Sequence, residues 1–379
     1  AFESTYSCLG ITCAQVGALK DSSTGALLST KTAACSDVSV YRAPIAGYIP
    51  GSDVIEHNKI DLDQAAMETE LSAANFAGAE AHYAVGGNSM KSGGSFRTIR
   101  GFSTGAQSKM YDGCPGCPYK HYKMFYDYYG DFDYADKWVS AALAGTSMTF
   151  SSGRHGPNDF STLGNAARVE AVKKGSAYMN VWMYAIREFE DAIDDCLTCT
   201  SSCNEHSNDP SVHAWDEGVA FYTGSLEGTL GSSSGKLVYR LAEKRCANFG
   251  TCGTSGDAFT GTSYVNHELL TLFTEGEQRL QRGECSAVRP LVNRIVSLMT
   301  VPLVQGSIRY AYNIGEGGGR SQKNAAEGAT FSAAVLPLVA RCSPGAAQTI
   351  SDNQKFGLYD AGNYGSFDAV KSAFESTYS

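Results

Sequence analysis

The chain has 379 residues, 43% of them hydrophobic and 11% aromatic, which is enough to bury a large core. Its formal net charge is −9, from 30 Lys and Arg against 39 Asp and Glu, so a nucleic-acid backbone or an anionic membrane surface is disfavoured as a partner. No apolar run reaches the roughly 18 residues of a membrane span, and no basic-then-apolar leader begins the chain. We therefore expect no membrane span, and an exported protein would be present here in its mature form.

The cysteine content favours an oxidising compartment. A set of twelve, even in number and scattered along the chain, would need a metal or redox explanation in a reducing cytosol, but only disulfides outside it. We predict six bridges among Cys8, Cys13, Cys35, Cys114, Cys117, Cys196, Cys199, Cys203, Cys246, Cys252, Cys285 and Cys342. Close spacing suggests the pairs Cys8–Cys13, Cys114–Cys117 and Cys246–Cys252, although spacing alone does not determine connectivity.

The first half of the chain alternates between loops and helices. Residues 20–59 contain Ser, Thr, Gly and Pro without periodicity and are predicted to form a covering loop. Residues 61–85 have an apolar stripe at helical spacing, whereas the Gly- and Ser-rich residues 86–113 are predicted as loop. Residues 119–143 are predicted to form two helices with a break near Gly130.

The second half is more continuously helical. A long helix is predicted over residues 160–196, apolar in its middle and acidic at its end. Residues 212–228 form another, with Pro210 in its first turn and small residues that allow a second helix to approach closely. Further helices are predicted over 236–249, 264–282, 287–314 (interrupted at Pro302) and 322–341. Because no stretch alternates with period two, we predict a single all-α domain of about ten helices.

The two ends of the chain carry the same seven residues. AFESTYS occupies residues 1–7 and again 373–379, which indicates a repeat of period 372, with 1–379 as one unit and 373–379 as the start of the next. Joined end to end, the two copies would form one amphipathic helix across the junction. The residues expected on its apolar side are Phe367, Val370, Phe374, Tyr378, Phe2 and Tyr6. The alternative is a terminal segment that merely looks alike.

Two helices carry residues suited to metal binding. Glu190 and Asp194 are four apart near the end of one helix, and His213 and Glu217 are four apart on the next, so each pair shares a helix face. Antiparallel packing through the intervening loop would bring the two pairs together. Carboxylates with an imidazole suit iron, zinc or manganese better than a metal that prefers soft ligands. The sequence therefore predicts a metal site made of these four residues.

A purely structural role for these acids is the competing interpretation. Carboxylates near a helix N-terminus are favourable without any ligand, and buried acids could instead pair with Arg187 or Arg309. For catalysis, the seven scattered histidines offer no credible nucleophile–base pair, so we do not predict an enzyme.

Several long segments resemble the algal iron-assimilation family of low-iron-inducible periplasmic or secreted proteins. They are DEGVAFYTGSLEG (216–228), LAEKRCANFGTC (241–252), MTVPLVQGSIRYAY (299–312) and AAEGATFSAAVLPLVARCSP (325–344). The resemblance implies a periplasmic or extracellular location and a link to iron acquisition without catalysis, with iron as the implied metal. It supplies no ligand set, so the predicted metal site depends on residue spacing alone.

Two hypotheses on function follow. In the first, which we favour for the role of this chain, it is one unit of a secreted, tandemly repeated structural chain or filament whose partners are copies of itself. In the second, which is compatible with the first and which we favour for the ancestry of the fold, it is an iron-binding protein of the cell surface or periplasm that acts in iron uptake. The terminal repeat favours the first, and the family resemblance favours the second.

Overall fold

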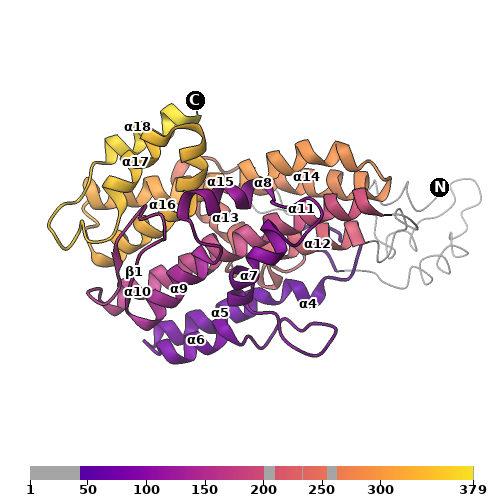
Figure 1. Cartoon of the computed structure of the whole chain (residues 1–379), viewed down its shortest axis with the longest axis horizontal. Helices are drawn as coiled ribbons and strands as arrows, with labels where there is room; N and C mark the ends of the chain where they lie inside the picture. The colour runs from indigo at the N-terminus through magenta and orange to yellow at the C-terminus, as the bar shows by residue number, and fades with distance from the viewer. Residues whose placement is uncertain (1–42, 200–209, 233, 254–262, 379) are drawn as a thin grey trace, which may run out of the picture. The chain divides into compact units, whose positions relative to one another are not determined.

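The computed structural model describes residues 43–199, 210–232, 234–253 and 263–378 (Figure 1). Contacts divide the chain into the units Ala1–Ala43 and Pro44–Ser379, and every element of the described part lies in the second. The α-helices are α4 (Ile55–Asn58), α5 (Ile60–Ser72), α6 (Phe76–Ala84), α7 (Ile99–Thr104), α8 (Lys120–Tyr129), α9 (Tyr134–Ala144), α10 (Asn165–Gly175), α11 (Trp182–Thr198), α12 (Pro210–Thr223), α13 (Val238–Phe249), α14 (Tyr264–Gln281), α15 (Cys285–Gly315), α16 (Gln322–Cys342), α17 (Pro344–Gln354) and α18 (Phe367–Tyr378).

Other regular structure in the described part is short. Two π-helical segments, η2 (Gln107–Tyr111) and η3 (Ser176–Val181), and the 3₁₀ turn η4 (Ser225–Glu227) connect or extend α-helices. The strands β1 (Ser147–Met148) and β2 (Asn158–Asp159) form a two-residue antiparallel ladder. The all-α prediction is confirmed, because helices supply nearly all the regular structure.

Helix ends in this fold follow local sequence signals. Ser343 begins α17 with its side chain accepting a hydrogen bond from the backbone N–H of Ala346, and Pro344 follows it in the first turn. Gly130 ends α8 in the left-handed conformation, with φ 77°, a geometry that favours glycine. The break predicted near Gly130 is therefore confirmed between α8 and α9.

Three predictions for the first half of the chain were wrong. Residues 61–85 form two helices, because Ala74 adopts φ 56° and the side chain of Asn75 caps a new helix by accepting from the N–H of Gly78 at 3.1 Å. The segment 86–113, predicted as loop, contains α7 and η2. The segment 20–59 ends in the one-turn helix α4, which also was not predicted.

The predicted interruption at Pro302 was also wrong, since α15 continues through both Pro290 and Pro302. Proline removes one backbone hydrogen bond, but tertiary packing on both sides holds the helix together. α15 is the one helix of the described part that is long and apolar enough to cross a membrane by length and composition, and 50% of its most apolar window is buried in this fold. That burial is expected of a core helix.

Small residues allow the closest helix contacts. α11 packs along α12, and a Cβ at Gly218 on α12 would lie 2.7 Å from the Phe189 ring on α11. A Cβ at Gly276 on α14 would lie only 2.0 Å from the Trp215 ring. The prediction that the small residues of 212–228 permit close approach is therefore confirmed for Gly218.

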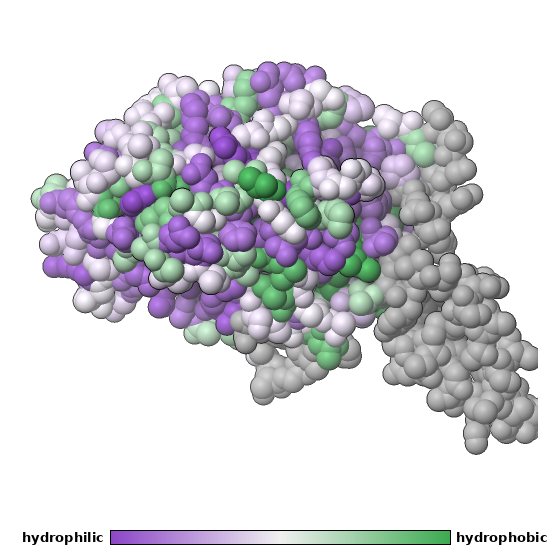
Figure 2. Space-filling model, turned by 90° about the horizontal axis from the view of Figure 1, so that it is seen from below, coloured by the Kyte–Doolittle hydropathy of each residue, from purple (hydrophilic) through white to green (hydrophobic). Residues whose placement is uncertain are grey.

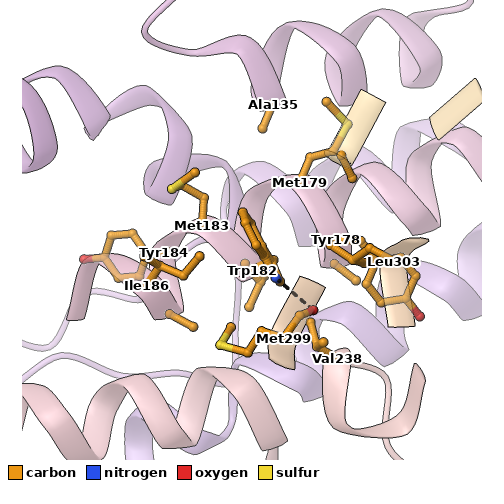
Figure 3. Close-up of a cluster of buried hydrophobic side chains, with 14 of the residues drawn as sticks. Ala135, Tyr178, Met179, Trp182, Met183, Tyr184, Ile186, Val238, Met299 and Leu303 are labelled. Carbon is orange, nitrogen blue, oxygen red and sulfur yellow. Dashed lines mark hydrogen bonds between the residues drawn. The ribbon is translucent and has the colours of Figure 1, made fainter. Parts of the chain in front are cut away.

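The main hydrophobic cluster of buried residues extends from Ala46 to Phe374, and Ile45, Val54 and Ala220 form a second, small cluster. Figure 3 shows its centre, where Trp182 lies among Met179, Met183 and Met299. The Trp182 indole N–H donates to the carbonyl oxygen of Met299 at 3.3 Å, so the buried polar atom keeps a partner. On the face shown in Figure 2, apolar residues lie scattered among polar ones.

Disulfides join Cys114 to Cys117, Cys246 to Cys252 and Cys196 to Cys285. The first two are the close pairs expected from spacing within the described part. Cys199 is also disulfide-bonded, whereas Cys342 is an exposed free thiol, contrary to the prediction that it forms a bridge. The predicted positions Cys8, Cys13, Cys35 and Cys203 lie outside the described residues.

The C-terminal copy of the repeated segment is helical, as predicted. It ends α18, which packs on α17 and α15 (Figure 1). Val370 and Phe374 are buried there. Phe367 contacts the ring of Tyr312, but Tyr378 is 50% exposed. Phe2 and Tyr6, the junction residues from the first copy, lie outside the described residues.

A candidate metal site

Three side chains from two helices converge on one point. His213 and Glu217 lie one turn apart on α12, and His57 projects from α4. The Nε2 atoms of His57 and His213 lie 2.9 Å and 3.1 Å from the same Glu217 Oε1 atom. One potential ligand atom from each residue lies within 4.8 Å of the other two. The three residues are named here the His57–His213–Glu217 cluster.

Asp216, the residue next to Glu217, links the segment that precedes α4 to α12. Asp216 is fully buried, and its Oδ2 atom accepts from the Ser52 backbone N–H at 2.6 Å and from the Ser52 hydroxyl at 2.7 Å. Its Oδ1 atom accepts from the Tyr48 hydroxyl. Because residues 48–52 lead directly into α4, these bonds hold His57 against α12.

The same serine orients His213. The Ser52 oxygen lies 3.0 Å from His213 Nδ1, and its hydroxyl proton is already donated to Asp216. The hydroxyl oxygen therefore accepts a hydrogen bond from Nδ1–H, and Nε2 offers a lone pair to a metal once the ring gives up the proton that Nε2 shares with Glu217. A hydrogen bond at one ring nitrogen commonly fixes the tautomer that binds metal through the other.

Burial and mutual hydrogen bonding perturb the titration of the cluster. Burial works to raise the pKa of Glu217, but hydrogen bonds from His213 and His57 hold that pKa well below its usual range. Burial lowers the pKa of His57, whereas the hydrogen bond to Glu217 raises the pKa of His213. At neutral pH the cluster thus combines an ionised carboxylate with an imidazole that favours its neutral form, as metal binding requires.

Positive side chains border the cluster. The Arg97 guanidinium contacts His57 Nε2 through Nη2, and its Nη1 donates to the carbonyl oxygen of Met90 at 2.6 Å. Lys109 on η2 donates to the Tyr184 hydroxyl at 2.7 Å, and burial lowers the Lys109 pKa. These cations keep the Glu217 carboxylate from being an isolated buried charge.

Only two of the four predicted ligands come together, and the predicted four-residue site is corrected accordingly. His213 and Glu217 belong to the cluster, but Glu190 pairs with His121 Nδ1 at 3.2 Å and with Arg289. Asp194 accepts from the Gly116 N–H at 2.8 Å and from the Tyr119 hydroxyl at 2.9 Å.

The orientation of α11 explains this division. Burial, followed by the charge of Glu217, raises the pKa of Glu188 to about 8, so Glu188 is the α11 carboxylate that lies near the cluster. Two residues further along, a helix has turned by about 200°, which points Glu190 away from α12. Arg187 pairs with Glu188 and with Asp191, so the ion-pair interpretation is correct for those two acids.

His57 was missed in the sequence because it lies on a single helical turn within a segment that has no periodicity. Arg97 was also missed, because the glycine-rich residues 86–113, which contain it, have no periodicity and were predicted as loop. No spacing rule connects either residue to His213, and hydrogen bonds distant in sequence, such as those of Asp216 with Ser52 and Tyr48, bring α4 to α12.

Two imidazole nitrogens and one carboxylate oxygen form a donor set that fits Fe(II), Zn(II) and Mn(II). Three protein ligands leave coordination positions for water or an incoming group. The half-exposed His213, with 34% of its side chain accessible, gives a route from solvent. The chemistry of the residues present therefore fits a reversibly bound divalent cation.

The chain matches the model of a known family. The family described as "Low iron-inducible periplasmic protein" matches residues 23–332, which include all three residues of the cluster. Comparisons with curated proteins and with solved structures give no match.

Proposed function

Because the chain belongs to the low iron-inducible periplasmic protein family, we propose that it captures iron for uptake through the His57–His213–Glu217 cluster, without catalysing a reaction. The family places the protein in the periplasm or outside the cell. In that location the protein encounters iron before the iron is transported into the cell, so reversible binding is sufficient for a role in assimilation. Of the two hypotheses drawn from the sequence, iron binding is the better supported.

The observation that carries the proposal is the convergence of three donor atoms within 4.8 Å, contributed by two separate segments. The Ser52 hydroxyl, which is bonded to Asp216, holds the His213 imidazole in place before any metal arrives, and the contacts with both histidines hold the Glu217 carboxylate. Such preorganisation reduces the conformational entropy that binding must overcome. Two histidines and one carboxylate also add only one negative charge, which suits release as well as capture.

Metal titration tests the proposal. We expect one equivalent of Fe(II) under anaerobic conditions, or of Co(II) as a spectroscopic probe, to bind the purified protein. His57→Ala and Glu217→Gln each remove a ligand and should weaken binding by at least about tenfold. His82→Ala, on α6 and outside the cluster, is the matched control. Equal binding by all four proteins, or binding by none, contradicts the proposal.

The terminal repeat supports a second candidate function, in which the chain is one unit of a tandem structural array. The repeated AFESTYS ends α18, and Phe374 anchors that helix in the core. In a tandem array, a following unit would lie next to the end of α18 at Tyr378. Mass measurement of the native protein after reduction tests this role, because tandem units give a multiple of roughly 40.3 kDa. A mass of one unit contradicts it.

A further inference from the structure

Arg245 on α13 is a buried cation without a partner. Only 8% of the residue is exposed, and neither Nε nor Nη1 of its guanidinium has a hydrogen-bond partner in the described part of the chain. Removing a charged group from water is costly unless a counter-charge and hydrogen bonds replace the water. Arginine cannot avoid this cost by losing its proton, because it stays charged in proteins. A bound anion would supply what the guanidinium lacks.

A second arginine lies beside the first. Burial lowers the pKa of Arg245, and the charge of Arg309 on α15, the helix on which α13 packs, acts in the same direction. Among the described residues, no carboxylate forms an ion pair with either arginine, and Arg309 is half-buried. The two residues, named here the Arg245–Arg309 pair, therefore place two positive charges together, one in the interior and one within reach of solvent.

The acids near the pair are already balanced by lysines. Glu327 on α16, which is 4% exposed, works to raise the pKa of Arg245, but its carboxylate lies 3.4 Å from the Lys174 ammonium. Lys174 also lies 3.1 Å from Glu170, and Glu170 lies 3.7 Å from Lys323. Two lysines and two glutamates thus neutralise each other. The two arginines keep two positive charges, which a divalent anion would match.

Aromatic side chains line the same region. Tyr310 and Tyr178 act on the Arg245 guanidinium, and their rings stack on Phe331 with centroid separations of 5.8 Å and 5.3 Å. Burial raises the pKa of both phenols, so they stay protonated at neutral pH and add no negative charge. In such apolar surroundings a hydrogen-bonded ion pair is stronger than in water.

We propose that the Arg245–Arg309 pair binds a small divalent oxyanion, of the phosphate or sulfate type, between α13 and α15. Each planar guanidinium presents paired N–H donors that match two oxygens of such an anion. The depth of Arg245 favours a free ion over a phosphate group on a macromolecule. The net charge of −9 repels anions from most of the protein, so binding should be confined to this local excess of positive charge. The site shares no residue with the His57–His213–Glu217 cluster, so this function is additional to metal binding.

Isothermal titration calorimetry with inorganic phosphate and with sulfate tests the inference. We expect one equivalent of either anion to bind the purified protein, and Arg309→Gln to weaken binding by at least about tenfold, because it removes charge-assisted hydrogen bonds. Arg294→Gln is the matched control on the same helix, because Arg294 pairs with Glu268 at 2.6 Å. It should bind both anions as the wild type does. A peptide that carries one phosphoserine should bind at least about tenfold more weakly than free phosphate.

A second variant tests the burial argument without any anion. Arg245→Met replaces the unpaired charge by an apolar side chain, so in chloride buffer it should raise the unfolding temperature, and it should abolish anion binding. Circular dichroism confirms that each variant is folded. A fall in the unfolding temperature would show that the guanidinium is already balanced, and would overturn the inference.

Three binding results would also overturn it. Absence of phosphate and sulfate binding by the wild type would mean that there is no anion site. Equal binding by wild type and Arg309→Gln would place the anion elsewhere. Binding of the phosphoserine peptide as tightly as free phosphate would reject the free ion as the ligand. Arg309→Gln should leave Co(II) affinity unchanged, so the anion site and the metal site are tested separately.

Discussion

His57 and His213 direct their Nε2 atoms at one carboxylate oxygen, with their rings edge to face and 5.2 Å between centroids. The two histidines come from different helices, and no short-range sequence signal relates them. Their meeting depends on the buried Asp216, which ties the segment before α4 to α12. The three metal-binding side chains therefore come together only in the folded chain. Loss of the hydrogen bonds of Asp216 should move His57 away from His213 and Glu217.

The carboxylates of α11 allow the corrected ligand set to be tested. Glu190→Gln leaves His121 and Arg289 without a charged partner and should destabilise the protein by about 1–3 kcal/mol. It should leave Co(II) affinity unchanged, because Glu190 points away from the cluster. Urea denaturation and metal titration of the same variant separate the two effects. Weakened metal binding in Glu190→Gln would restore the ligand set predicted from spacing.

The sequence was sufficient to predict two residues of the cluster, His213 and Glu217, because helical spacing is a local property. His213 and Glu217 share a face whatever surrounds them, and the packing of α11 along α12 follows from small residues such as Gly218. The sequence does not show which face of α11 points toward α12. Glu188 and Glu190 are therefore equally plausible ligands until the neighbouring side chains are placed. His57 was not accessible because a one-turn helix leaves no period in the sequence.

The contact between α12 and α14 should tolerate no added methyl group. A Cβ at Gly276 would lie 2.0 Å from the Trp215 ring, which is fully buried and donates its N–H to the Phe273 carbonyl. Gly276→Ala should therefore lower the free energy of unfolding by about 1–3 kcal/mol.

Gly345→Ala provides the control for this test. Gly345 lies in α17 with no heavy atom within 4 Å of the added Cβ, and alanine there should raise stability by about 0.5–1 kcal/mol. Urea denaturation measures both variants. Equal effects of the two substitutions would show that helix propensity, and not the contact with Trp215, decides the outcome.

A buried histidine away from the metal site should make stability depend on pH. The Nε2–H group of His155 donates to the Ala329 carbonyl at 2.9 Å, and Nδ1 lies 3.0 Å from the Ser351 hydroxyl, so the neutral ring is fully bonded. Burial lowers the His155 pKa to about 4, from 6.5 in an exposed ring.

Between those two pKa values the unfolded chain binds one more proton at this site than the folded chain. Stability contributed here is therefore constant above about pH 7 and falls by about 3 kcal/mol as the pH drops from 6.5 to 4. Denaturant unfolding across that range measures the loss. His155→Gln should flatten this part of the profile, and a profile unchanged by the substitution would assign the dependence to other groups.

The last prediction concerns the repeated segment at the end of the chain. Phe374 is 2% exposed, so Phe374→Ala should destabilise the protein by about 3–5 kcal/mol, whereas Tyr378→Ala should have little effect in a single unit because Tyr378 is 50% exposed. In a chain of two tandem units, the junction helix would cover Tyr378, and the same substitution should then lower stability measurably. Thermal unfolding of one-unit and two-unit chains makes the comparison. An equal, small effect of Tyr378→Ala in both would mean that the tyrosine does not contribute to a junction, and that the repeat joins units without burying their ends.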